Sequence, residues 1–183
     1  MVQRILFVRA VNVGGASMPM AEFRTLLTDL GATSAVTLIA SGNAVIEIDM
    51  PTSGSTAEFD RRVEAGITDR FGFTREVISR SVSEVAQART EHPLAVADLA
   101  RSYVCFLGGV PTAEAIDAAR LIPTGDDEWS LGGRDLHVRY AAGAGRADLD
   151  LNRLLRALGV VGTARNLRTV DRIHTLALSS TNR

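Results

Sequence analysis

The chain has 183 residues, 46% of them hydrophobic and 22% charged, which is typical of one globular domain or two small ones and not of a disordered chain. The formal net charge is −1, and all twenty basic residues are arginine. The lack of lysine excludes Schiff-base chemistry and the phosphate-binding lysine of a P-loop. A single cysteine, Cys105, excludes an intramolecular disulfide.

Charge is distributed unevenly along the chain. Nine arginines against four aspartates give residues 134–183 a charge of +5, which leaves −6 for residues 1–133.

The first apolar run stops at Arg9 and is too short for a signal peptide or a membrane span. We therefore expect a cytoplasmic protein that does not associate with membranes.

The first half predicts the order βαββαβ. A continuous apolar run indicates a strand buried on both faces, and a glycine between two β-rich segments indicates a hairpin. Apolar residues at helical spacing indicate the helices. The predicted elements are a strand at 5–8, a helix from Pro19 to Gly31, a hairpin of residues 36–40 and 44–48, a helix with Phe59, Val63, Ile67 and Phe71, and a strand at 75–80.

The second half predicts the order βαββα followed by one extra helix. In residues 134–140 Leu136 and Val138 alternate with His137 and Arg139, which predicts one apolar face and one wet face. The predicted elements are a strand at 102–107, a helix at 112–121, strands at 127–131 and 134–140, a helix at 147–158, a short segment G-T-A-R-N, and a last helix through Val170, Ile173 and Leu176.

These patterns predict an α+β protein made of two ferredoxin-like (α/β-plait) halves, each an antiparallel sheet with helices packed on one face. The first half spans residues 1–80 and the second spans residues 102–183, with the extra C-terminal helix. Residues 81–101 are the connector and contain a short helix.

Four stretches resemble a bacterial domain-of-unknown-function family, the one numbered 1697. They are V-R-A-V-N-V-G-G-A-S-M-P-M, A-S-G-N-A-V-I, G-A-G-R-A-D-L and G-T-A-R-N-L-R-T-V, in the family's order and spacing over about residues 3–178. The resemblance implies two α/β-plait halves and implies no activity. The chain departs from the family's pattern at Ala10, Ala40, Leu167 and Arg168.

The first candidate site is formed by two glycine turns. In a βαββαβ plait the first two strands run parallel, so their ends, the Asn12–Gly15 loop and the Ser41–Asn43 turn, meet at one edge of the sheet. The loop also leads to a helix N-terminus, where free N–H groups favour an anion. The candidate ligand-binding residues here are Arg9, Asn12, Gly14, Gly15, Ser41, Gly42 and Asn43; the alternative is that the glycines and asparagines only form turns.

The second candidate group flanks two helix starts and consists of Arg146, Thr163, Arg165, Asn166 and Thr169. The alternative is that Thr169 is only an N-cap of the last helix and Arg146 only a solvated charge. No catalytic residue is assigned. The histidines occur singly, with no zinc motif, and Ser41 has no nucleophile elbow. We expect neither a metal nor a cofactor.

Three functions remain open. The first is a protein that binds a small anionic or polar ligand at the two turns. The second is an enzyme of unassigned reaction that uses the same pocket, with asparagine and arginine as electrostatic stabilisers. The third is a nucleic-acid-binding module that uses the arginine-rich C-terminal third. The nine aromatic residues, most of them at core-like positions, are few for RNA binding, so we expect no nucleic-acid partner.

Overall fold

The computed structural model describes residues 1–12, 14–49 and 56–180. Two compact units share the chain. The first comprises residues 1–86 together with 172–183, and the second comprises residues 87–171. The predicted second half, 102–183, therefore differs from the observed second unit, because the end of the last helix groups with the first unit.

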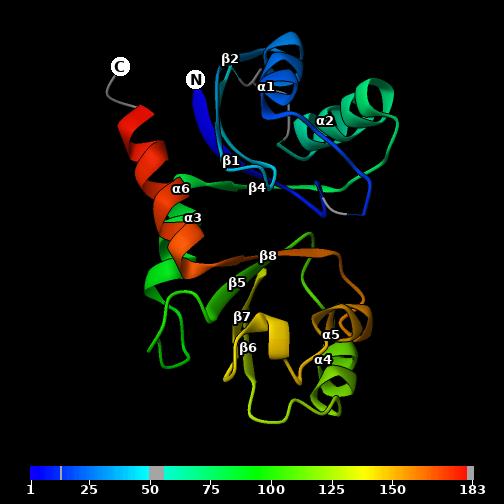
Figure 1. Ribbon diagram of the computed structural model, residues 1–183, viewed down its shortest axis with the longest axis vertical. Coiled ribbons are helices and arrows are strands. Elements are labelled where there is room, and N and C mark those ends of the chain that lie inside the picture. Colours follow the sequence, from blue (N-terminus) through cyan, green and yellow to red (C-terminus); the bar gives the residue numbers. More distant parts are fainter. Residues whose placement is uncertain (13, 50–55, 181–183) are drawn as a thin grey trace. The chain divides into compact units, whose positions relative to one another are not determined.

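The first unit has the order βαββαβ around one antiparallel sheet (Figure 1), with strands arranged β2-β3-β1-β4. This is the order of a ferredoxin-like plait, in which β1 and β2 run parallel on either side of β3. The elements are β1 (Val2–Val8), α1 (Met20–Asp29), β2 (Ala32–Leu38), β3 (Asn43–Ile48), α2 (Thr56–Phe71) and β4 (Val77–Ser81).

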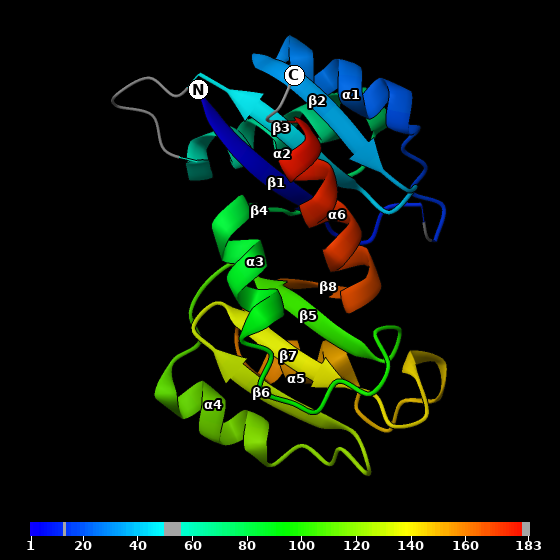
Figure 2. The ribbon, with the colours of Figure 1, turned by 90° about the vertical axis from the view of Figure 1, so that its left-hand side faces the viewer.

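The core of this unit lies between the sheet and the helices α1 and α2. Leu6 and Val8 of β1 face it, and α1 and α2 contribute apolar residues at helical spacing, among them Phe23 and Ile67. Figure 2 shows α6 (Leu167–Ser180) on the other side of this sheet, and Gln3 Nε2 donates to the carbonyl of Ala177, 3.1 Å away. The sheet is thus covered on both faces, as the continuous apolar run of β1 predicts.

The second unit repeats the topology, with strands arranged β6-β7-β5-β8. Its core contains Leu136 and Val138 of β7 and Leu154 of α5. The elements that follow β4 are α3 (Val82–Thr90), β5 (Ser102–Leu107), α4 (Ala113–Arg120), β6 (Glu128–Gly132), β7 (Asp135–Arg139), a 3-10 turn η1 (Ala144–Arg146), α5 (Leu151–Ala157), β8 (Gly162–Asn166) and α6.

The prediction for the second half was wrong in two places. The segment G-T-A-R-N is a strand, β8, which pairs antiparallel with β5, so this half is also βαββαβ. The predicted wet face of β7 is not wet at His137, whose side chain is only 4% exposed because the connector residue His92 packs against it. The two antiparallel sheets with their helices are confirmed.

Candidate functional site

The two predicted turns meet at one end of the first sheet, as plait topology requires. We call the turn edge residues 10–18, apart from Val13, which lies outside the described residues, together with residues 39–43. The side-chain amide Nδ2 of Asn12 donates to the carbonyl of Ala40 at 2.5 Å. The backbone N–H of Val8 donates to the carbonyl of Gly42 at 2.8 Å.

The side chains of both asparagines of the turn edge form hydrogen bonds with main-chain groups of the turns. Asn12 Oδ1 accepts a hydrogen bond from the N–H of Met18 at 2.8 Å, which closes the loop that leads into α1. Asn43 is fully buried and donates to the carbonyl of Leu38 at 3.3 Å and to Ser41 Oγ at 2.8 Å. Their side-chain amides therefore stabilise the turns, and each such bond is worth about 1 kcal/mol.

Backbone strain is concentrated at the turn edge. Among the described residues, those other than glycine with positive φ are Ala10 (47°), Asn12 (56°) and Ile39 (50°), and all three lie here. The left-handed conformation costs Ala10 and Ile39 roughly 1–2 kcal/mol each, whereas asparagine adopts it more readily. Gly42 allows the two turns to approach, since a Cβ on it would lie 2.7 Å from Val11 Cγ2. Strain of this kind persists only where the surrounding structure enforces it, and it is common at functional sites.

Positive groups surround the turn edge. Arg9, at the end of β1, places Nη1 3.3 Å from a carboxylate oxygen of Glu76, and Arg75 Nε donates to the carbonyl of Ala10 at 3.0 Å. The helix α1 begins after Pro19, whose side chain makes no capping hydrogen bond. Its first N–H groups thus lack a side-chain cap, and the helix dipole favours an anion there.

In the second predicted group, hydrogen bonds join Arg165 to Thr163 and Asn166 to Thr169. Arg165, on β8, donates through Nη1 to Thr163 Oγ1 at 2.7 Å, and its burial lowers the pKa of the guanidinium to about 10. Asn166 Oδ1 accepts from the N–H of Thr169 at 2.9 Å, so the N-cap of α6 is Asn166, and the alternative that Thr169 caps this helix is wrong. Arg146 lies exposed in η1.

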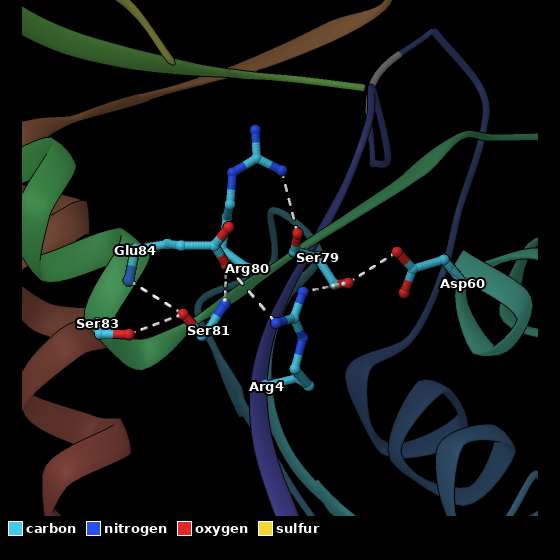
Figure 3. Close-up of polar contacts among 7 residues, drawn as sticks. All are labelled: Arg4, Asp60, Ser79, Arg80, Ser81, Ser83 and Glu84. Atoms are coloured by element: carbon cyan, nitrogen blue, oxygen red, sulfur yellow. Dashed lines mark hydrogen bonds and ion pairs between the residues drawn. The ribbon is translucent and has the colours of Figure 1, made fainter. Parts of the chain in front are cut away.

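A polar network at β4 was missed by the sequence analysis (Figure 3). Arg4, on β1, donates through Nη2 to Ser79 Oγ at 3.1 Å, and its Nη1 lies 3.6 Å from Glu84 Oε2. Ser79 Oγ in turn donates to Asp60 Oδ2 of α2 at 2.7 Å. Strand alternation directs Arg80, which is 1% exposed, to the opposite face from Ser79.

Part of this network can be recognised in the sequence as a helix-capping motif. Ser81 and Glu84 are the reciprocal partners of a capping box, S-x-x-E, at the start of α3. The N–H of Ser81 donates to Glu84 Oε2 at 2.6 Å, and the N–H of Glu84 donates to Ser81 Oγ at 3.1 Å. Burial alone would raise the pKa of Glu84, but these bonds and Arg4 outweigh it and lower the pKa. Burial raises the pKa of Asp60 despite its bond from Ser79. The network ties α2 and α3 to the sheet.

The first 137 residues match the family model described as "Protein of unknown function (DUF1697)". The chain belongs to this family. The DUF1697 match includes the turn edge and the polar network at β4, whereas β8 and its residues Thr163, Arg165 and Asn166 lie beyond it. The family description assigns no ligand or reaction to any of them.

Structural comparison supports the fold. The conserved bacterial protein SP0830 from Streptococcus pneumoniae is similar over 97% of this chain and 98% of its own length, with a TM-score of 0.69 and 22% sequence identity. No curated protein matches the chain. At this identity the likeness concerns the two-unit fold alone.

The described part of the chain shows neither a metal-ligand cluster nor a membrane-spanning helix. Residues 1–12, 14–49 and 56–180 contain no group of three or more histidine, cysteine, aspartate and glutamate side chains that could hold a metal ion. Within the same part of the chain, no helix combines the length and apolar character needed to cross a bilayer.

Proposed function

We propose that this DUF1697 protein binds a small anionic or polar molecule at the turn edge. The observation that carries the proposal is the coincidence of three left-handed residues other than glycine, Ala10, Asn12 and Ile39, with a helix start whose N-cap residue, Pro19, makes no side-chain capping bond. A turn that is fully hydrogen-bonded within itself does not need such strain to fold, so the strain supports a functional reading.

The groups available to the ligand differ from those expected first. Asn12 and Asn43 shape the turns through backbone bonds, so the ligand is held by what those turns present. Gly14 and Gly15 are exposed, and among the described residues beyond their chain neighbours no atom lies within 4 Å of where their Cβ atoms would be. Their backbone N–H groups, the start of α1 and the guanidinium of Arg9 are the anion-binding elements of this proposal.

Arg9 and Glu76 allow the proposal to be tested in both directions. Replacing Glu76 by glutamine removes the carboxylate that competes for Arg9, so it should tighten anion binding. Arg9→Gln should weaken it, and Arg120→Gln, at an exposed arginine of α4 that belongs to neither candidate group, should leave it unchanged. The probes are inorganic phosphate and acetate, and the binding of each is monitored through the chemical shifts of the backbone amides in NMR spectra. Shifts spread away from residues 9–22 and 39–43, or equal affinities in R9Q and E76Q, would contradict the proposal.

The proposal includes a cytoplasmic location and no nucleic-acid partner. The excess arginines of the C-terminal third are in part already engaged: Arg139 Nε lies 2.6 Å from Glu128 Oε2, and Arg165 donates to Thr163. Binding that rests on phosphate contacts weakens steeply with salt. We expect no submicromolar binding of duplex or single-stranded nucleic acid near physiological ionic strength, as measured by fluorescence anisotropy.

A further inference from the structure

The second unit has a polar cavity of about 440 Å³ that is separate from the turn edge. One wall comes from the end of α3 and from Pro93 of the connector, and the other from the β6–β7 hairpin. The hairpin turns at Gly132–Gly133, and β7 brings Asp135 and His137 to the cavity. We call this the His137 cavity; its polar lining includes Gln87, Glu91, Ser130, Asp135 and His137.

One ring nitrogen of His137, Nδ1, has no hydrogen-bond partner among the described residues. The side chain of His137 is only 4% exposed, and this nitrogen is buried. The ring of His92 packs edge-on at 4.8 Å between centroids, while its own nitrogens lie 3.3 Å from two carbonyl oxygens, those of Leu94 and Tyr103. Buried polar groups in folded proteins are nearly always paired, so an unpaired imidazole nitrogen of a residue that lines a cavity indicates a missing partner.

The imidazole is neutral at physiological pH. Burial and the nearby His92 lower the pKa of His137 to about 4. A neutral imidazole carries one N–H donor and one acceptor nitrogen, so it can accept a hydrogen bond from a ligand without adding a positive charge to the site.

The charged side chains that line the cavity are negative. Glu91 and Asp135 are carboxylates, and no arginine is among the described lining residues. Glu91 is oriented by Gln87, whose Nε2 donates to both carboxylate oxygens at 3.1 and 3.0 Å. Ser130, opposite His137 in the β6–β7 ladder, adds a hydroxyl. Carboxylates that line a concave site raise the local concentration of cations.

We propose that the His137 cavity binds a small organic cation, a primary amine or diamine, whose N–H groups donate to Glu91, Asp135 and the imidazole of His137. A metal ion fits less well, because no group of three ligating side chains of the kind a metal requires occurs among the described residues. This site does not depend on the proposal for the turn edge, since its residues all belong to the second unit.

The test uses the full chain and titrates 1,4-diaminobutane, with butane-1,4-diol and succinate as uncharged and anionic probes of the same length. Imidazole NMR follows His137. We expect the diamine alone to shift its resonances, with an affinity that falls as salt is raised. The proposal would be overturned if the diol shifted the His137 resonances as much as the diamine does, or if the diamine did not shift them at all.

Variants assign the binding to the carboxylates. Glu91→Gln and Asp135→Asn should each weaken diamine binding by roughly three- to tenfold, since each removes one charge at contact distance. Glu114→Gln, an exposed carboxylate at the start of α4 in the same unit, is the matched control and should change it less than about twofold. Unchanged affinity in the E91Q/D135N double variant would refute the assignment. If that variant does not fold, the salt dependence and the diol comparison in the wild type still decide.

Discussion

Protonation of His137 should destabilise the second unit. Its pKa is lowered from 6.5 to about 4, because burial and His92 disfavour the imidazolium. In the unfolded chain the same histidine takes up a proton near its ordinary pKa. Between these two pH values the unfolded state therefore holds more protons than the folded state. The stability is fully present above pH 6.5 and is lost as the pH falls toward 4.

The size of the effect follows from the displacement of the pKa. Each pKa unit corresponds to about 1.4 kcal/mol, so moving a fully enclosed histidine from 6.5 to about 4 is worth roughly 3 kcal/mol. The His137 ring lines a cavity, which lets solvent screen part of the charge. We therefore expect about 2 kcal/mol of lost stability between pH 6.5 and 4.5.

The single tryptophan, Trp129 on β6, packs against the core of the second unit and reports on its unfolding. Urea unfolding followed by its fluorescence at pH 7.0, 5.5 and 4.5 gives the free energy at each pH. His137→Gln should flatten the pH dependence by about 2 kcal/mol. A pKa of His137 at or above 6 by imidazole NMR, or an unchanged slope in H137Q, would show that the reasoning is wrong.

Three further predictions concern turns, caps and burial. Gly42→Ala forces a Cβ against neighbouring side chains and should cost about 2–3 kcal/mol in urea unfolding, whereas Gly14→Ala, with open space around it, should cost only about 1 from its positive φ; equal costs would contradict the close approach. Asn166→Ala should cost about 1 kcal/mol by removing the N-cap of α6, and Thr169→Ala clearly less; the reverse order would restore Thr169 as the cap. For Asp60 the raised pKa means that its stabilising contribution is present at low pH and lost as the pH rises through the folded value, so Asp60→Asn should flatten that loss while keeping an acceptor for Ser79. A steeper loss in D60N would exclude this account.

Local pattern predicted most of the fold. The continuous apolar run of β1, the glycine hairpin before β3 and the helical spacing in α2 are local signals, and each element formed where it was expected. The strand β8 was missed because its sequence, G-T-A-R-N, has neither alternation nor a β-branched run. It becomes a strand because β5 has a free edge in a plait and offers a ladder from Tyr103 to Leu107. Tertiary pairing thus overrides weak local propensity.

The candidate site shows the same division between local and long-range information. Topology alone placed the Asn12 loop beside the Ser41 turn, since the strand order of a plait fixes which ends coincide. It did not reveal that the carbonyl groups of Met18 and Ala40 would take up the Asn12 amide. Nor did the alternation in β7 show that His137 would be covered, because the covering residue, His92, lies forty-five positions earlier in the connector.

Because Asn12 and Asn43 stabilise the turns, their side-chain amides are not the groups that the proposed ligand contacts, and other groups of the turn edge must hold it. The side-chain amides of this turn already form hydrogen bonds with its own backbone. A ligand can therefore be held only by groups that make no such bond within the turn. At this edge those groups are the exposed loop N–H groups at Gly14 and Gly15, the start of α1 and the cations beside it. If the turn edge binds an anion as proposed, replacing an asparagine lowers stability and anion binding together, because it dismantles the loop that presents those N–H groups. Replacing Arg9 changes the charge while the turn keeps its bonds to Asn12. A loss of anion binding in R9Q at unchanged stability would thus distinguish a binding site from a structural turn.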